Sequence, residues 1–250
     1  MSTASRANPF LNITERAVWG AGTLEMALPL VEAVKIRPGM RVLEVGAGSG
    51  QVAAILAAHW DVSVVALEPW EGGQEIQARA AAAGVGQRVL GLKLKAQDLG
   101  IVADGTFDAV ISIGSFEIIG DERPQALEQM VRVAKPGARV GIAEPMCLPV
   151  PIPPEVLELD RRAGTRWHDY HFRTVEWNRA LFERHGLTVG ASDAYYFPDA
   201  YSWWLDYAAA RKVPPAEHEL IRADGGRWLS LGLVVGQKAR ESSRPLGVTR

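Results

Sequence analysis

The stretch Val42-Leu43-Glu44-Val45-Gly46-Ala47-Gly48-Ser49-Gly50 decides the fold of this 250-residue chain. It completes a short, mostly apolar run, Arg41–Val45, that is typical of a buried strand, and the next segment, Gln51–Trp60, has the pattern of a helix. The glycines allow a tight turn and let a ligand approach the backbone without meeting a Cβ atom. Because the first turn of a helix also carries N–H groups without intrahelical partners, the stretch predicts a ligand-binding strand–loop–helix turn.

Strand and helix patterns alternate on both sides of that turn, between Arg41 and Glu144. Nearly continuous apolar strands separated by helices are typical of a parallel sheet that is covered on both faces, which places the chain in the α/β class. The further strands are expected at Val62–Leu67, Val89–Lys95, Phe107–Ile113 and Arg139–Ala143, and the further helices at Gly72–Gly84 and Arg123–Val133.

The rhythm changes after Glu144, where prolines at 145, 149, 151, 153 and 154 argue against regular structure. Beyond them we expect a helix capped by Thr174 and ended by Gly186, and a strand at Leu187–Tyr196. The remaining patterns predict two helices, Tyr201–Arg211 and Pro215–Ala223, followed by a last strand, Trp228–Gln237. The sequence thus predicts one domain, 1–237, with a flexible tail at 238–250. Its ligand-binding core is expected at 41–144 and its substrate-side segments at 1–23, 145–174 and 195–228.

Two kinds of nucleotide ligand compete for the glycine turn. The dinucleotide fingerprint is G-x-G-x-x-G, whereas this chain has G-x-G-x-G with Gln51 where the third glycine of the fingerprint would stand. Glu44, inside the first strand, has no obvious use at a pyrophosphate site, but a ligand with a cationic amine could use it directly or through water. These two residues favour the amine-bearing ligand, and a glycine-rich turn without any ligand is the third interpretation.

Polar residues follow the next strands of the predicted sheet. Glu68 ends the second strand, 18 residues after Gly50, where a carboxylate accepts hydrogen bonds from ribose hydroxyls. Asp98, after the third strand, either accepts a bond from an adenine amino group or caps a turn. Ser115, Phe116 and Glu117 leave the strand Phe107–Ile113, and strand C-termini line the ligand crevice of open α/β sheets, so we expect these three to face a ligand.

Taken in order, Leu43–Gly50, Glu68, Asp98, Phe107–Glu117 and the Lys135–Val140 turn resemble the motifs of class I S-adenosylmethionine (SAM)-dependent methyltransferases of the small-molecule type. The resemblance covers about two fifths of the chain. It implies a Rossmann-like, mostly parallel seven-stranded sheet with helices on both faces, an antiparallel last strand and a helical insert between the last two strands. It also implies SAM as cofactor and S-adenosylhomocysteine as product. The implied cofactor-binding residues are Trp19, Gly20, Glu44, Gly46, Ala47, Gly48, Gly50, Glu68, Pro69, Gln97, Asp98 and Ser115.

The N-terminal segment Ala17–Thr23 allows two interpretations that can both hold. It resembles the short Gly-rich segment that folds over the methionine end of SAM in some small-molecule members, and it also reads as a helix start with Thr23 as cap. After the fourth strand, Ser115–Ile118 reads SFEI and is not a [DN]PPY tetrapeptide. This argues against methylation of nucleobase or glutamine amines by that route.

Candidate acceptor-side residues come from three segments. His168 and His171 are candidate catalytic bases because histidine titrates near neutrality, and Glu117 is the next carboxylate at the edge of the fourth strand. Five aromatic residues either line an apolar acceptor pocket or pack the protein core: Phe116, Tyr170, Trp203, Trp204 and Tyr207. The five histidines lack metal-ligand spacing, so no metal site is expected.

Composition narrows the class of partner. The net charge is −2, so no overall field favours nucleic acid or an anionic membrane. No stretch approaches the roughly 20 apolar residues of a membrane span. A single cysteine, Cys147, gives no intramolecular disulfide, and we expect a cytoplasmic protein. The sequence does not indicate an oligomeric state. It predicts a SAM-dependent methyltransferase for a small-molecule acceptor. The alternatives are a SAM-binding regulatory module and a nicotinamide-dependent oxidoreductase.

Overall fold

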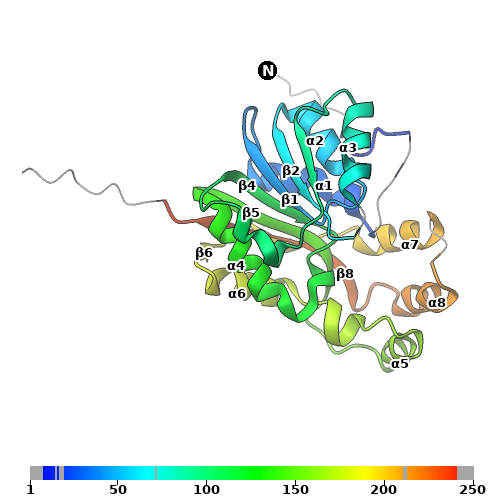
Figure 1. Ribbon diagram of the computed structural model, residues 1–250. Helices are drawn as coiled ribbons and strands as arrows, with labels where there is room; N and C mark the ends of the chain where they lie inside the picture. Colours follow the sequence, from blue (N-terminus) through cyan, green and yellow to red (C-terminus); the bar gives the residue numbers. More distant parts are fainter. Residues whose placement is uncertain (1–7, 15, 17–19, 71, 211–212, 241–250) are drawn as a thin grey trace, which may run out of the picture.

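The computed structural model describes residues 8–14, 16, 20–70, 72–210 and 213–240. Helices and strands alternate through most of this range (Figure 1). The helices are α1 Thr23–Val34, α2 Gln51–Trp60, α3 Gly72–Ala82, α4 Arg123–Val133, α5 Pro154–Ala163, α6 Val175–Arg184, α7 Ala200–Ala210 and α8 Pro215–Asp224, with the short helices η1 Ala96–Ile101, η2 Glu117–Glu122 and η3 Trp167–His171. The strands are β1 Arg41–Val45, β2 Ser63–Leu67, β3 Val89–Leu92, β4 Phe107–Ile113, β5 Ala134–Cys147, β6 Leu187–Thr188, β7 Ala194–Tyr196 and β8 Leu229–Lys238.

One sheet organises the described residues, with the strand order β3-β2-β1-β4-β5-β8-β6 and with β7 also paired to β8. Strands β1 to β5 are parallel, and β8 runs antiparallel to β5. The predicted Rossmann-like fold with an antiparallel last strand is therefore confirmed. The sheet has eight strands where seven were expected, because the single strand expected at Leu187–Tyr196 is interrupted. At the interruption the Asp193 carboxylate turns back to Gly190 N–H and pairs with Arg139.

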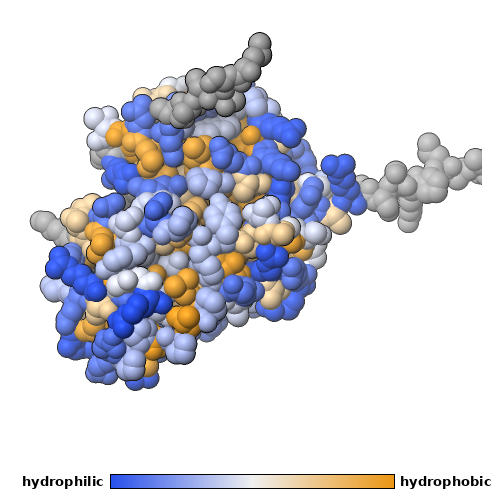
Figure 2. All heavy atoms as spheres, turned by 180° about the vertical axis from the view of Figure 1, so that it is seen from behind, coloured by the Kyte–Doolittle hydropathy of each residue, from blue (hydrophilic) through white to orange (hydrophobic). Residues whose placement is uncertain are grey.

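Alternating side chains of the strands feed two cores. Val42 and Val64 pack with α1, α2 and α3, whereas Leu43 and Leu67 point to the opposite face and pack with α4 and α6. This alternation follows from the two-residue period of a strand. Figure 1 shows the two groups of helices on opposite sides of the sheet. In Figure 2, which views the molecule from behind, apolar residues lie in small groups among hydrophilic ones.

Two expectations about the second half of the chain were wrong. Strand β5 continues through Pro145 to Cys147, because beyond the end of β4 it pairs with β8, where Pro145 lies opposite Leu231. The flexible tail was expected to begin at 238, but β8 includes Lys238, whose Nζ donates to the carbonyls of Val131 and Ala134 at 2.8 and 2.7 Å.

The order of the strands places the candidate site. The chain first moves outward from β1 to β2 and β3, then returns to add β4 and β5 on the other side of β1. The loops that follow β1 and β4 therefore lie side by side at the carboxyl edge of the sheet, at the point where ligands bind in such sheets. Within the described residues, no helix is both long and apolar enough to cross a membrane.

Candidate functional site

The glycine turn after β1 is shaped by its protein neighbours. Gly46, Gly48 and Gly50 have φ angles of 71°, 52° and 77°, in the left-handed region that favours glycine. A Cβ on Gly46 would come closer than 3.0 Å to Ser115 Oγ, and one on Gly50 would lie 2.9 Å from Ile76 Cα in α3. Two of these glycines therefore also make room for protein neighbours, Gly46 for Ser115 and Gly50 for α3.

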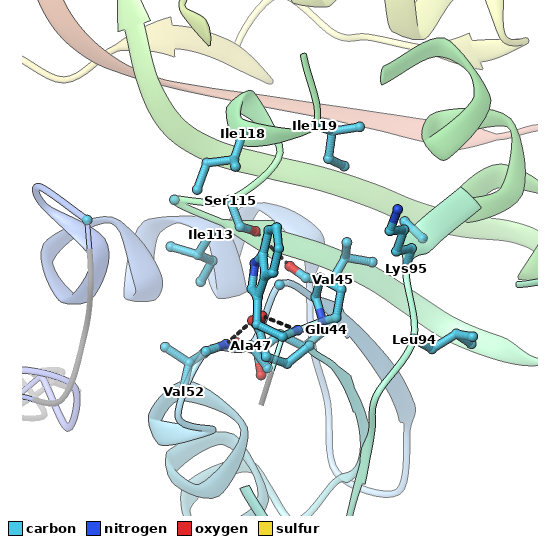
Figure 3. Close-up of a pocket in the computed structure, with 18 of the residues that line it drawn as sticks. Glu44, Val45, Ala47, Val52, Leu94, Lys95, Ile113, Ser115, Ile118 and Ile119 are labelled. Carbon is cyan, nitrogen blue, oxygen red and sulfur yellow. Dashed lines mark hydrogen bonds between the residues drawn. The ribbon is translucent and has the colours of Figure 1, made fainter. Parts of the chain in front are cut away.

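Two serines lock the loop after β4 to the end of β1. The Val45 carbonyl accepts hydrogen bonds from Ser112 Oγ at 3.0 Å and from Ser115 Oγ at 2.9 Å, and the two hydroxyls lie 2.8 Å apart. Figure 3 shows Ser115 directed at Val45. The two loops therefore form one rigid edge around the candidate site.

Glu68 ties the turn to the end of β2. Its carboxylate is buried and accepts hydrogen bonds from Gly48 N–H at 2.9 Å and Trp70 N–H at 3.3 Å. A carboxylate offers about four acceptor positions, so these two bonds leave capacity for ligand hydroxyls. Glu68 thus orders the glycine turn and keeps free lone pairs beside it.

Glu44 is buried with an unsatisfied oxygen. Only 2% of the residue is exposed, and its Oε2 has no hydrogen-bond partner within the described part of the chain. Burial raises the pKa of Glu44 to about 8, against the opposing effect of the Ala53 N–H. An unpaired buried carboxylate costs free energy, and a cation beside it would remove that cost. This residue lines the cavity described next.

A cavity of about 920 Å³ opens along the carboxyl edge of the sheet (Figure 3). Most of the expected cofactor residues line it: Gly20, Glu44, Gly46, Ala47, Gly48, Glu68, Pro69, Gln97 and Ser115. Of the expected acceptor residues, Tyr170 lines it. Trp19 lies outside the described residues. The cavity therefore joins the loops after β1, β2, β3 and β4 with η3.

Sequence reasoning missed several residues of this cavity. Trp70 is 69% exposed and lines it next to Pro69, while Ile118 and Ile119 of η2 line it together with Lys95. In Figure 3, Ile113, Ile118 and Ile119 gather on one side, and Glu44 and Ala47 lie below them. The available signal in the sequence was a tryptophan two residues after Glu68, at the end of a predicted strand; its exposure is known only from the structure.

Two expected cofactor residues lie elsewhere. Asp98 is exposed on η1 and is not among the described residues that line the cavity. Its neighbour Gln97 does line the cavity, and its side-chain amide donates to Glu122 Oε2 at 2.8 Å. Gly50 is likewise outside the lining, because it packs against Ile76. In this structure Gln97 takes the cavity position that was expected for Asp98.

Most of the expected acceptor aromatics pack the protein interior. Phe116 is fully buried in the core on the α4 side, and Trp204 is buried 5.3 Å from Trp167 and 5.8 Å from Tyr207 between ring centroids. Trp203 packs against Phe197 with ring centroids 5.4 Å apart. These contacts favour the packing interpretation: Trp203, Trp204 and Tyr207 pack within the helical insert and its neighbours, and Phe116 packs on the α4 side of the sheet.

The candidate bases also lie behind the cavity wall. His168 Nδ1 pairs with the fully buried Asp160, which also accepts from Trp167 N–H at 2.9 Å, so this histidine anchors its own loop. His171 Nδ1 lies 3.4 Å from the Glu117 carbonyl, and burial lowers the pKa of His171. Burial raises the pKa of Glu117 to about 7. None of the three is among the described residues that line the cavity.

A methyltransferase-domain family model matches residues 42–137, the stretch that contains the glycine turn, Glu68 and Gln97. The matched stretch is less than half of the chain, and over it the chain is similar to a methyltransferase domain. A relative in Mycobacterium tuberculosis, an uncharacterized protein, is 35% identical over 158 residues, which cover 59% of this chain and 56% of that one. A demethylmenaquinone methyltransferase of Clavibacter sepedonicus is 34% identical over 152 residues, which cover 60% and 57%.

A solved structure extends the likeness over most of the chain. A SAM-dependent methyltransferase from Geobacter sulfurreducens, in complex with S-adenosylhomocysteine, superposes with a TM-score of 0.64 at 22% identity and covers 88% of this chain and 93% of that one. At this identity the likeness concerns the fold. The chain spans little more than half the length of the curated relatives above. The segments that follow residue 137, including η3 and the helical insert, lie outside the stretch that the family model matches.

Proposed function

We propose that this protein transfers a methyl group from SAM to a small-molecule acceptor. The observation that carries the proposal is the buried Oε2 of Glu44 in the wall of the cavity, which has no hydrogen-bond partner among the described residues. SAM bears an ammonium group that suits this carboxylate, and ribose hydroxyls that suit the remaining lone pairs of Glu68. A nicotinamide dinucleotide has no ammonium group to pair with Glu44. The methyltransferase-domain match over the same residues supports the same ligand.

The sulfonium of SAM supplies an already activated methyl group, so the chain has to hold the acceptor in line and keep water out. Ile113, Ile118, Ile119 and Tyr170 line the cavity at the carboxyl end of β4 and beyond it. A concave, mostly apolar wall with a few polar groups suits a small acceptor with an apolar face. Proximity and alignment are therefore the main contribution of this chain to the reaction.

A catalytic base is needed only when the acceptor group loses a proton on methylation, as a hydroxyl does. His168 is already committed to Asp160, which weakens its candidacy as base. Burial lowers the pKa of the half-buried His171, which favours its neutral, proton-accepting form, and raises the pKa of Glu117 to about 7. They remain the candidate bases, on condition that η3 or η2 moves to bring one of them to the cavity.

Calorimetric titration with S-adenosylhomocysteine and with NADH tests the ligand. We expect one molecule of S-adenosylhomocysteine to bind per chain and NADH not to bind; the reverse result would refute the proposal. Transfer of labelled methyl from SAM to a panel of small acceptors with apolar faces, such as 2-naphthol, indole and octanoic acid, then tests the reaction. Binding without transfer to any of a broad panel would favour the alternative of a regulatory SAM-binding module.

Three further expectations, about domain extent, cellular location and nucleic acid, belong to the same proposal. Residues 1–237 act as one domain, in which the matched core and the acceptor-side segments share the single sheet. The protein works in the cytoplasm, where its one thiol, Cys147, stays reduced and buried. It acts without nucleic acid as a partner, since its net charge is −2. Cell fractionation and limited proteolysis test the location and the domain.

A further inference from the structure

A buried arginine joins two segments that are far apart in the sequence. Arg123 is the first residue of α4 and is 1% exposed. Its Nε donates to the Gly120 carbonyl of η2 at 2.7 Å, and its two terminal nitrogens donate to the carbonyls of His171 and Tyr170 at 2.9 and 2.8 Å. The planar guanidinium thus connects η2 to η3 through three backbone oxygens.

The same contact is built around one glycine. Gly120 has φ 64° and ψ −127°, and a Cβ there would come closer than 3.0 Å to the ring of Tyr170. The ring therefore lies directly on the backbone of η2. The Arg166 guanidinium also lies over this ring, 4.6 Å from its centroid. Tyr170 is held between η2 and Arg166.

The arrangement forms part of the cavity wall. Tyr170 lines the cavity from η3, and Ile118 and Ile119 line it from η2. Arg123 itself is not among the described residues that line it. Arg123 therefore affects the cavity wall indirectly, through its hydrogen bonds to the backbone carbonyls of η2 and η3.

Two buried carboxyl groups compensate the charge of the arginine. Glu117 and Glu144 are 5% and 1% exposed, are joined by a side-chain hydrogen bond, and both have their pKa raised by burial. Two carboxyl groups this close cannot both ionise easily, and the positive charge of Arg123 opposes the rise of both pKa values. Negative charge on this pair favours a buried guanidinium whose described hydrogen bonds all go to carbonyls.

We propose that Arg123 is a positioning residue that clamps η3 onto η2 and so fixes Tyr170, with Ile118 and Ile119, as the acceptor-side wall of the cavity. The assignment of this wall to the acceptor rests on the proposed function. The SAM-side residues Glu44 and Glu68 belong to other loops, and none of their described hydrogen bonds involves η2 or η3. Gln97 donates to Glu122 at the last residue of η2, and this bond involves neither Arg123 nor Tyr170. Loosening the clamp should therefore weaken acceptor binding and leave SAM-side binding intact.

The test compares Arg123→Lys and Gly120→Ala with the control Arg132→Lys in the full chain. Lysine keeps the charge but cannot make the forked bonds to two carbonyls, and an alanine Cβ displaces the Tyr170 ring. Arg132 is a matched control because it lies in the same helix and also donates to two carbonyls, those of Leu99 and Val102, at a distance from η3. Gly120→Ala keeps the proposal testable where Arg123→Lys does not fold.

The first readout is hydrogen exchange of the ligand-free proteins. We expect at least tenfold faster exchange over residues 166–171 in both clamp variants, with unchanged exchange in β1, β4 and α2, and no change in the control. The second readout is binding. With saturating S-adenosylhomocysteine, affinity for the probe 2-naphthol should fall about tenfold, because binding must then also order the loosened wall, while affinity for S-adenosylhomocysteine stays within twofold.

Unchanged exchange over 166–171 in a folded clamp variant would overturn the clamp. An equal loss of affinity for S-adenosylhomocysteine and for 2-naphthol would overturn its assignment to the acceptor side. Failure of the wild-type protein to bind S-adenosylhomocysteine would instead refute the proposed function, and the exchange of the ligand-free variants would still decide the clamp.

Discussion

Binding of the SAM ammonium group should expel a proton from Glu44. The pKa of Glu44 is raised to about 8 by burial, so at pH 6.5 the ligand-free protein carries this side chain almost fully protonated. An α-amino group has a pKa of roughly 7.7–8.0 and is then almost fully charged. When the ammonium occupies the site, the carboxylate is favoured, and about 0.9 proton should be released per molecule bound at pH 6.5.

Calorimetry measures this release directly. Titrations with S-adenosylhomocysteine at pH 6.5 in buffers of different ionisation enthalpy give apparent enthalpies whose slope is the number of protons released. We expect a slope near one for the wild-type protein and near zero for Glu44→Gln, which also binds more weakly. A slope near zero in the wild-type protein, or the same slope in Glu44→Gln, would refute the role of Glu44 as the partner of the ammonium group.

The same substitution should change stability with pH. A carboxyl group whose pKa is raised by folding favours the fold fully below about pH 4.5 and loses that contribution as the pH rises towards 8. Through this group alone, the free energy of unfolding of the wild-type protein should fall by roughly 3 kcal/mol between pH 5 and pH 8. Denaturant unfolding of ligand-free Glu44→Gln should lack this loss. Parallel stability curves for the two proteins would contradict the buried, unpaired state of Glu44.

The remaining predictions concern the turn, the exposed tryptophan and the histidine. Gly46→Ala should lower both thermal stability and affinity for S-adenosylhomocysteine, since its Cβ meets Ser115. Adding Ser115→Gly should restore part of the loss. Equal melting temperatures for the wild-type protein and Gly46→Ala would exclude the clash. Trp70→Ala should weaken S-adenosylhomocysteine binding about tenfold by calorimetry, an effect of the size of one stacking contact, without changing stability, because the side chain is 69% exposed. His168→Gln should lower the melting temperature, because it removes a partner of the buried Asp160, and change turnover little once folded; a 100-fold loss of turnover at full stability would restore His168 as base.

Local pattern was enough for the elements around the site. The expected ranges Arg41–Val45, Gln51–Trp60, Phe107–Ile113 and Arg123–Val133 coincide with β1, α2, β4 and α4. Thr174 caps α6 as expected, with Oγ1 accepting from Trp177 N–H at 3.1 Å. These features depend on the period of apolar residues and on caps, which a single sequence shows.

Contacts between distant segments were beyond local pattern. The glycine at 46 is explained by Ser115 of the loop after β4, and the glycine at 120 by Tyr170 of η3. The same holds for Phe116, which follows a strand end but turns into the core. The end of a strand predicts that the next side chains lie at the ligand-binding edge of the sheet. The short helix that follows decides which of these side chains face the ligand and which face the core.

The aromatic residues of the insert show the same limit. A sequence that contains Trp203 and Trp204 near the carboxyl edge fits a pocket and a packed interface equally well. The structure uses Trp204 to join α7 with Trp167 and Phe172, while Tyr170, three residues beyond Trp167, reaches the cavity. The one-turn π-helix of η3, which no pattern indicated, sets that difference.

A crystal structure with S-adenosylhomocysteine bound would test the central claim most directly. The account predicts the amino group of the ligand at Glu44, the ribose hydroxyls at Glu68, and the sulfur open towards Ile118, Ile119 and Tyr170. A ligand bound away from Glu44, or with its sulfur turned from η2 and η3, would contradict it.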